Sequence, residues 1–432
     1  MRKRTNLASD IHLMNSESKI KRPVDRIAVA LLTGGSDRPY VYGLTKVLLT
    51  AGVQLDLIGS DELIFPEFAA NQGLSFLNLR GSQNTRAGIL EKTVRICKYY
   101  VRLLRYAASA KPKLFHILWN NRFEYFDRTL LMLYYKLLGK KILFTAHNVN
   151  ANKRDSRDSR LNRLTLGIQY RFSDCIFVHT EKMKQELASE FDVEESKISV
   201  IPFGINNAVP NTALTPEEAK KRLGVGPTDR TLLFFGRITP YKGVEYLIDA
   251  FRRVSARNEN YKLLIAGRVD RAEAYWMPIK AGLANEIASG KIVVRDHFIP
   301  DEETEIYFKA ADALVLPYKD IYQSGVLFLA HSFGLPVLAA DVGSLADDII
   351  PDKTGFAFAP ENSVDLARVI EQYFSSSLYA NLGSRRADIQ EFTRKTHSWS
   401  IVAETTQKKY AELLKHGSDT LSNASLDLTL PS

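Results

Sequence analysis

Cysteine is scarce in this chain. Its 432 residues include two cysteines, Cys97 and Cys175, so the sequence offers no framework of disulfide bonds. A small secreted domain held together by disulfides is therefore not indicated. The scarcity is typical of proteins that keep their thiols reduced, and we expect a cytoplasmic protein.

Long apolar runs of the kind that span a membrane are also missing. The longest uncharged stretch, "IYQSGVLFLAHSFGLPVLAA" at 321–340, has the length of a span. Gln323, His331 and a break at Gly334–Pro336 interrupt it, so it predicts a helix, a turn and a strand. Residues 1–23 are basic but lack the apolar core of a secretory leader, and we expect a disordered tail there.

Metal and nucleic-acid signatures are absent from the sequence as well. It has no D-x-D pair to hold a metal on a diphosphate, no zinc-ligand spacing and no aromatic RNA-binding motif. We expect no metal, no cofactor and no nucleic-acid partner. The charge nevertheless favours anionic partners, because 58 Lys and Arg against 49 Asp and Glu give a net charge of +9. Phosphorylated substrates and an anionic membrane surface both fit that charge.

Apolar runs alternate with helical patterns along most of the chain. "RIAVALL" at 26–32 is followed by a glycine turn, a helix and another strand, and "TLLFFG", "YKLLIAG" and "ADALVLP" repeat the pattern later. Such alternation indicates α/β structure, with parallel sheets that carry helices on both faces. Because 432 residues exceed one ordinary core, we predict two doubly wound, Rossmann-like domains.

Composition suggests where these domains begin and end. We predict a first domain at 24–205, a polar, proline-containing linker at 206–218 and a second domain at 219–397. The amphipathic stretch 398–415 is followed by no strand and predicts a final helix. We expect a disordered tail at 416–432.

Two cations follow a predicted strand in "FFGRITPYKG" at 234–243. Ligands of open parallel sheets bind beyond the carboxyl ends of the strands, and helix N-termini favour anions. Arg237 offers a planar fork to phosphate oxygens, and Lys242 offers a mobile point charge. The spacing alone predicts either a phosphate clamp or two solvated residues of a surface loop.

Five ordered stretches of the second half resemble the donor domain of glycosyltransferase family 4. They are "FFGRITPYKGVEYLIDAF", "YKLLIAG", "YFKAADALVLPY", "FGLPVLAADVGSLADDI" and "DKTGFAF". The first half resembles the family more loosely through "LLTGGSDRPYVYGLTKVLLTAG", "TAHN" and "FVHTEKMKQEL". The resemblance implies a GT-B fold, in which two Rossmann-like domains face a cleft and the final helix, 398–415, crosses back to brace the first domain.

The same resemblance implies an activity. Enzymes of this family move a sugar, here a hexosyl group, from a nucleoside-diphosphate sugar to a saccharide or a lipid-linked saccharide, with retention of configuration. Bacterial polysaccharide and glycolipid synthesis are the settings that the resemblance suggests. It assigns the diphosphate of the donor to Arg237 and Lys242, beside Gly236.

The chain departs from the family pattern at one motif. Many members carry two glutamates eight positions apart, one for the donor sugar and one for the ribose, where this chain has Ile321 and Leu329. The loop "QSG" instead offers the backbone amides of Ser324 and Gly325 to the phosphates at a helix N-terminus, and Asp320 is a substitute for the first glutamate. The departure leaves retention of configuration and the identity of the nucleotide open.

Signals for the acceptor side are weaker. In "TGG" at 33–35, Gly34 and Gly35 either let a ligand approach the backbone or form an ordinary tight turn. His147 ends the strand 140–148 and either hydrogen-bonds the donor sugar or the acceptor hydroxyl or only caps the strand. Trp119 and Asn120 end the neighbouring strand, where Trp119 is either a stacking platform for a sugar or part of the core.

A basic amphipathic helix is predicted at 89–107. Five cations recur there every three or four residues and share one helical face: Lys92, Arg95, Lys98, Arg102 and Arg105. This face predicts either docking on anionic lipid headgroups, at the inner face of the membrane, or the solvated side of a core helix. The charged loop 152–160 also allows two interpretations, a solvated loop or a clamp for the acceptor.

The leading prediction is a metal-independent glycosyltransferase with His147, Arg237 and Lys242 as its catalytic groups. A phosphorylase or an epimerase of the same architecture is one alternative. An inactive nucleotide-binding scaffold is another, and Ile321 and Leu329 favour it. Release of UDP or GDP from one sugar nucleotide would distinguish turnover from binding alone.

Overall fold

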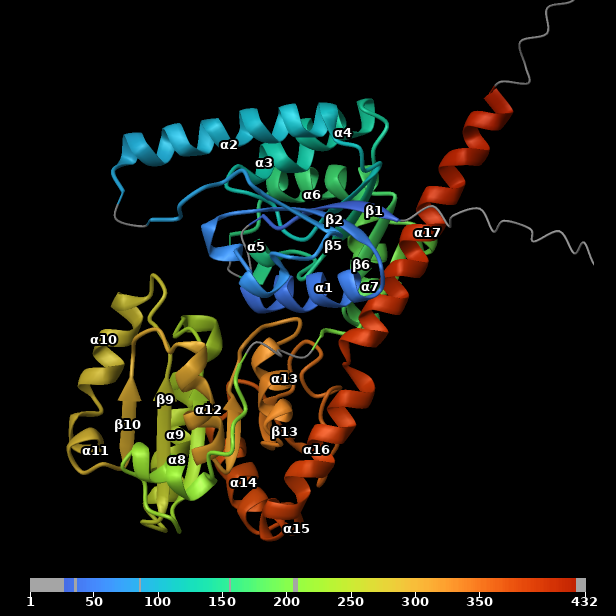
Figure 1. Ribbon diagram of the computed structural model, residues 1–432. Coiled ribbons are helices and arrows are strands. Elements are labelled where there is room, and N and C mark those ends of the chain that lie inside the picture. The colour runs from blue at the N-terminus through green and yellow to red at the C-terminus, as the bar shows by residue number, and fades with distance from the viewer. Residues whose placement is uncertain (1–26, 35–36, 85–86, 155–156, 205–208, 425–432) are drawn as a thin grey trace, which may run out of the picture.

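Two parallel sheets organise the protein. The computed structural model describes residues 27–34, 37–84, 87–154, 157–204 and 209–424. Figure 1 shows two α/β domains, one above the other, with helices around each sheet. The prediction of two Rossmann-like domains is confirmed, while the tail at 1–23 and Gly35 lie outside the described residues.

The first sheet has seven strands in the order β3-β2-β1-β4-β5-β6-β7, and every pair is parallel. Its strands are β1 (Ala28–Leu32), β2 (Gln54–Gly59), β3 (Leu74–Asn78), β4 (Leu114–Ile117), β5 (Lys141–Thr145), β6 (Cys175–Val178) and β7 (Ile198–Val200). The strands β4 and β6 are buried along their whole length because both faces of the sheet are covered. The edge strand β3 was not predicted from the sequence.

Helices cover the two faces of this sheet unequally. α1 (Arg38–Thr50) packs on one face, together with the final helix of the chain. The other face is covered by α2 (Ile89–Ser109), the π-helical turn η3 (Asp127–Leu131), α4 (Met132–Leu137), α6 (Arg160–Phe172) and α7 (Glu181–Phe191). Shorter elements are η1 (Asp61–Leu63), η2 (Pro66–Phe68), α3 (Glu124–Phe126), α5 (Ala151–Arg154) and η4 (Glu195–Lys197).

The second sheet has six parallel strands in the order β10-β9-β8-β11-β12-β13. They are β8 (Arg230–Phe235), β9 (Tyr261–Ala266), β10 (Ile292–Arg295), β11 (Ala313–Leu316), β12 (Val337–Ala340) and β13 (Gly355–Phe358). The helices are α8 (Pro216–Arg222), η5 (Pro240–Lys242), α9 (Val244–Ser255), α10 (Glu273–Ala281), α11 (Ala284–Ala288), α12 (Asp301–Ala310), α13 (Gly325–Ser332), α14 (Ser363–Phe374), α15 (Ser377–Ala380) and α16 (Leu382–Thr396). The uncharged run at 321–340 thus forms a helix, a turn and a strand, as predicted.

The final helix, α17 (Trp399–Ala424), crosses from the second domain to the first, as Figure 1 shows. The Trp399 indole fills a slot in which a Cβ at Gly43 of α1 or at Gly204 would overlap the ring. The Tyr410 hydroxyl lies 2.6 Å from Nδ1 of the buried His116 in β4. These contacts confirm that the helix braces the first domain.

Two sequence-based bounds need correction. The final helix continues to Ala424, so the expected disordered tail is wrong for residues 416–424, and residues 425–432 lie outside the described part. α8 begins at Pro216, inside the predicted linker 206–218. The bounds of the two domains otherwise stay predictions. Among the described helices, none combines the length and the hydropathy that a bilayer crossing requires.

Candidate functional site

Side chains of both domains meet at a junction between α1 and the loops of the second sheet. Arg38, the first residue of α1, forms an ion pair of 3.9 Å with Asp301 at the start of α12. Tyr322, in the loop before α13, donates its hydroxyl to Glu186 of α7 over 2.7 Å. The N-terminus of α1 therefore lies opposite the second domain.

Arg237 faces this junction. It follows β8, its side chain is 57% exposed, and its Nη1 lies 3.1 Å from Oδ2 of Asp270. Burial raises the pKa of Asp37, the residue that caps α1, and the nearby charge of Arg237 opposes that rise. The guanidinium is thus close to the first domain. Because its ion pair with Asp270 is solvent-exposed and weak, Arg237 is available to an anion.

Lys242 follows Arg237 by five residues along the chain and is almost fully buried. Its Nζ donates to the Tyr318 hydroxyl over 2.7 Å and lies 4.5 Å from the centre of that ring. Gly236 has a positive φ of 113°, and a Cβ there would approach the Lys242 Nζ to 3.3 Å. Gly243, at φ 61°, avoids an overlap with the Pro317 carbonyl. The two glycines let the loop fold tightly around the ammonium group.

Ser324 joins this arrangement at the N-terminus of α13. Its side chain is buried and does not cap its own helix, and it lies beside Tyr318, where it opposes the rise that burial causes in the pKa of the phenol. Gly325 is the first residue of α13, and a Cβ there would lie 3.3 Å from the Phe203 ring. Tyr318 therefore links Lys242 to the start of α13, where unpaired backbone N–H groups favour an anion.

The two positions of the missing glutamates are apolar in structure as well as in sequence. Ile321 and Leu329 are buried and belong to the hydrophobic core of the second domain. Asp320, the proposed substitute, has an exposed side chain. Neither core residue can bind a sugar hydroxyl, and the role of Asp320 stays a prediction.

His147 is paired with a second histidine that the sequence analysis did not single out. Its Nδ1 lies 2.9 Å from Nε2 of His179, and Nδ1 of His179 lies 3.3 Å from the Ile201 carbonyl oxygen. A carbonyl only accepts, so His179 donates from Nδ1 and accepts at Nε2 from Nδ1 of His147. These hydrogen bonds leave Nε2 of His147 as an acceptor, and among the described residues that nitrogen has no hydrogen-bond partner.

Both histidines are held neutral. Burial lowers the pKa of His179 to about 4, and burial followed by the proximity of His179 lowers the pKa of His147 well below its usual value. Neutral imidazoles keep the chain of donors and acceptors intact near pH 7.

Aromatic rings fix the orientation of His147. The Trp119 indole stacks on its imidazole with ring centres 4.2 Å apart and an angle of 5°, and the Tyr40 ring meets it edge-on at 4.8 Å. Trp119 thus packs on a candidate catalytic group, and its use as a sugar platform stays a prediction. Gly34, at φ 58°, is required because a Cβ there would overlap the Trp119 carbonyl. Asn120 forms a reciprocal amide pair with Gln169, at 3.1 and 2.7 Å.

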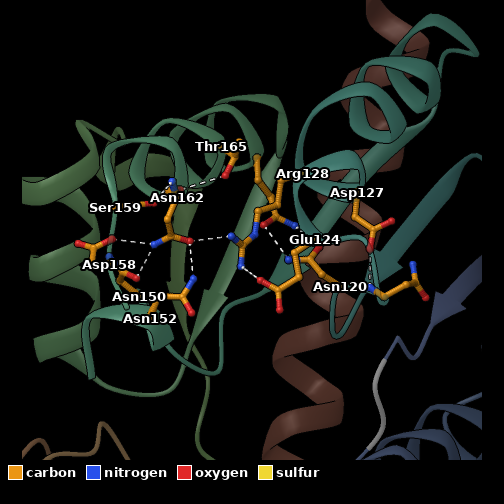
Figure 2. Close-up of polar contacts among 12 residues, drawn as sticks. Asn120, Glu124, Asp127, Arg128, Asn150, Asn152, Asp158, Ser159, Asn162 and Thr165 are labelled. Atoms are coloured by element: carbon orange, nitrogen blue, oxygen red, sulfur yellow. Dashed lines mark hydrogen bonds and ion pairs between the residues drawn. The ribbon is translucent and has the colours of Figure 1, made fainter. Parts of the chain in front are cut away.

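A buried polar network holds the loop that follows His147 (Figure 2). Asn162 of α6 is fully buried and accepts from Nη1 of Arg128 at 2.9 Å. Its amide nitrogen donates to Asn150 at 2.9 Å and to Asp158 at 2.8 Å. The described ends of the loop 152–160 are therefore anchored, which an ordinary solvated loop would not need. A role in binding the acceptor stays a prediction.

The basic residues of the helix predicted at 89–107 lie on α2. Lys98, Arg102 and Arg105 are exposed, and Lys92 and Arg95 are half-buried. The opposite face contributes Tyr99, Tyr100 and Leu103 to the core. Among the described residues, no group of three or more acidic, histidine or cysteine side chains is arranged to hold a metal ion.

Family models match both domains. The model described as Glycosyltransferase Family 4 matches residues 37–209, and the model described as Glycosyl transferases group 1 matches residues 216–396. The chain belongs to glycosyltransferase family 4. An uncharacterized glycosyltransferase of Methanocaldococcus jannaschii is 28% identical over 55% of this chain and 60% of its own length.

Other similar proteins agree. D-inositol 3-phosphate glycosyltransferase of Corynebacterium aurimucosum is 24% identical over 63% of this chain and 66% of its own length. The matches thus span less than two thirds of these relatives. Sucrose-phosphate synthase from Thermosynechococcus elongatus has a TM-score of 0.72 at 19% identity, covering 90% of this chain and 100% of that one. Anabaena HepE in complex with UDP and glucose has a TM-score of 0.69 at 14% identity, with the same coverage. These two structures show the GT-B fold of the family 4 chain.

Several residues of the site were missed from the sequence. Tyr318 follows β11 and His179 follows β6, both at the carboxyl ends of parallel strands. The rule that selected His147 and Arg237 would have selected them too. Arg128 and Asn162 gave no such signal, because each lies inside a helical segment and meets the other only in the folded chain.

Proposed function

We propose that this protein transfers a hexosyl group from a nucleoside-diphosphate sugar to a saccharide or a lipid-linked saccharide. The observation that carries the proposal is Tyr318, which binds Lys242, lies beside Ser324 at the start of α13 and is near enough to Arg237 to be affected by its charge. Hydrogen bonds to charged groups contribute about 1.5–3 kcal/mol each, so these donors suit a diphosphate. Membership of family 4 supports the same class of donor.

The reaction breaks the bond between the anomeric carbon of the sugar and the diphosphate oxygen. The bonding electron pair leaves with the diphosphate, and the acceptor oxygen forms the new bond to that carbon while its proton passes to Nε2 of His147. Arg237, Lys242 and the amides of Ser324 and Gly325 stabilise the negative charge that grows on the leaving group. These cations and helix-end amides supply enough positive charge that the proposal requires no metal.

The acceptor hydroxyl donates its hydrogen bond to Nε2 of His147 in this proposal. Stacking on Trp119 and the bond to His179 hold the imidazole in place, so little orientation is lost when the acceptor binds. Gly34, which contacts the Trp119 carbonyl, is assigned to the same acceptor site. We assign the other sugar contacts to Asn120 and Asp320, and we propose retention of configuration from family membership.

An inactive scaffold is the second candidate, and the buried Ile321 and Leu329 favour it. The two candidates differ in turnover. A panel of sugar nucleotides would first be screened by thermal shift, because a ligand that binds only the folded state raises its stability. The best donor would then be incubated with saccharide and lipid-linked acceptors, and release of nucleoside diphosphate would be measured.

Acceptor-dependent release supports the transferase. Tight binding without release, for every acceptor tested, supports the scaffold. Absence of any stabilising sugar nucleotide contradicts both. We propose a location at the inner face of the membrane, where polysaccharide and glycolipid acceptors are assembled.

A further inference from the structure

α2 carries two apolar stripes, although a helix on a sheet needs only one. Ile96, Tyr99, Tyr100, Leu103 and Ala107 pack into the core of the first domain. A second stripe faces solvent: Leu90 is 78% exposed, and Val94 and Val101 follow it four and eleven residues later on the same side. Exposed apolar side chains that repeat along one face mark an interaction surface.

Cations flank the outward stripe. Arg95, Lys98, Arg102 and Arg105 lie beside it, and Glu91 is the one carboxylate of α2. Leu79 and Arg80 complete an open groove of about 460 Å³ along the N-terminal half of the helix. Within the described residues, no ion pair neutralises these four cations of α2. The outward face of α2 thus presents apolar and cationic side chains next to each other.

Two neighbouring helices repeat the pattern. Leu130, Leu133 and Leu137 are exposed at helical spacing along η3 and α4, and Leu137 reaches 77%. On α6, Leu161 and Leu164 are exposed in the same way. The outward sides of η3, α4 and α6 therefore carry exposed apolar side chains, as α2 does.

These helices form one layer. Their buried residues belong to a single core cluster on one face of the first sheet. The Tyr134 hydroxyl of α4 donates to the Leu104 carbonyl of α2 over 3.1 Å, and Arg128 of η3 donates to Asn162 of α6. Figure 1 shows α2 along the side of the first domain that is farthest from the second, with α4 beside it.

We propose that this outer layer of α2, η3, α4 and α6 docks the protein on an anionic phospholipid bilayer. The leucines and valines enter the headgroup boundary, and the cations of α2 contact lipid phosphates. Charge selects this occupant, because an apolar surface bordered by unneutralised cations complements a bilayer with anionic headgroups. Delivery of a lipid-linked acceptor by this surface rests on the proposed function, whereas docking itself does not.

The experiment is flotation of the full chain with vesicles of phosphatidylcholine, alone or mixed with phosphatidylglycerol. One variant combines Arg95→Gln, Lys98→Gln, Arg102→Gln and Arg105→Gln, and a second combines Leu130→Ser, Leu133→Ser and Leu137→Ser. Matched controls lie in the second domain: Arg253→Gln with Arg257→Gln, Arg394→Gln and Lys395→Gln, and Met277→Ser with Phe298→Ser and Val364→Ser.

The wild-type chain is expected to float with the anionic vesicles only. Each variant of the layer is expected to bind about tenfold or more weakly, and the controls within about twofold of wild type. Failure of the wild-type chain to float, or equal loss in the controls, overturns the proposal. Self-association of the wild type that the leucine variant abolishes, without flotation, would instead identify an interface between two copies.

Turnover of a water-soluble saccharide acceptor separates this proposal from the proposed function. Docking variants that float poorly are expected to keep that turnover, because no substituted side chain lies at the domain junction. A wild-type chain that floats but never releases nucleoside diphosphate would contradict the transferase and leave docking intact.

Discussion

The two domains contribute opposite electrostatic characters to the junction. The second domain supplies charge, with Arg237 exposed and Lys242 buried. Around His147 the first domain supplies neutral groups, because burial keeps His147 and His179 uncharged, and Arg38 of this domain is paired with Asp301. A diphosphate favours positive charge, while a sugar hydroxyl needs only a hydrogen-bond acceptor, which a neutral imidazole can supply. In the proposed function, the asymmetry therefore favours a donor whose diphosphate points toward the second sheet.

The two sides also differ in how they are held. Glycines and one tyrosine hydroxyl shape the loop around Lys242, so this side depends on local sequence. The first domain relies on pairs of side chains from distant segments, such as His147 with His179 and Arg128 with Asn162. Single substitutions should consequently remove charge stabilisation on one side and positioning on the other.

Loss of a cation should have the largest effect. We expect Arg237→Ala and Lys242→Ala each to lower turnover about 10²-fold or more, as for the loss of one donor to a developing oxyanion. The measurement is the initial rate of nucleoside-diphosphate release at saturating acceptor. Arg253→Ala on α9 is the matched control, since this exposed arginine pairs with Asp249 of its own helix, and its rate should stay near wild type. Full turnover in both site variants would show that the diphosphate binds elsewhere.

The donor side could be predicted because its physics is local. The segment that directly follows β8 contains Gly236, Arg237 and Lys242. The rule for parallel sheets therefore places these residues at the ligand-binding edge without any knowledge of the rest of the chain. Ser324 and Gly325 follow for the same reason, at the first residues of a helix. Tyr318 is the member of this group that was overlooked, although it satisfies the same rule.

The acceptor side resisted prediction because its partners are far apart in sequence. His147 was found from the end of its strand, but its tautomer depends on His179 and on the Ile201 carbonyl. The orientation of Trp119 depends on Gly34, and the loop after His147 depends on Asn162. Strands with short apolar runs, such as the edge strands β3 and β13, were missed since no periodic pattern sets them apart.

Changes at the histidine pair should test the neutrality of the first domain. We expect His147→Ala to lower acceptor-dependent turnover by roughly 10²-fold and His179→Ala by roughly tenfold, while hydrolysis of the donor by water is less affected. Without its neighbour, the pKa of His147 should rise toward its usual value of 6.5. The acidic limb of the pH–rate profile should then move to higher pH in His179→Ala. An unchanged pH–rate profile would contradict the effect of His179 on the titration of His147.

Substitutions in the amide network around Asn162 should act on the stability of the fold rather than on the charge of the site. Asn162→Ala removes the acceptor of the Arg128 guanidinium and the donor to Asn150 and Asp158, all within the buried part of the domain. We expect the free energy of unfolding to fall by about 2–4 kcal/mol, because buried polar groups lose their partners. Urea denaturation measures this loss. Thr165→Val, which removes a single bond to the Asn162 carbonyl, should cost only about 1 kcal/mol. Equal losses would mean that the network acts only through packing.

The smallest expected effect concerns a neutral pair inside the second domain, beside Gln323 of the α13 loop. Burial raises the pKa of Asp348 to about 7, and burial lowers the pKa of His397 to about 4, while their Oδ1 and Nε2 atoms lie 3.8 Å apart. The exposed Asp347 and the buried His331 also face the pair.

The two members of the pair should oppose each other as pH changes. Asp348, raised above its unfolded value of 3.8, stabilises the fold below about pH 4 and loses this contribution as pH rises through 7. His397, lowered from 6.5, stabilises the fold above that pH and loses this contribution as pH falls through 4. Asp348→Asn should therefore leave a fold that weakens by about 1–2 kcal/mol on acidification, and His397→Gln a fold that weakens by a similar amount as pH rises. Urea denaturation across this window measures both slopes. Parallel slopes in the two variants would mean that the Asp348 carboxyl and the His397 imidazole do not titrate in this pH window.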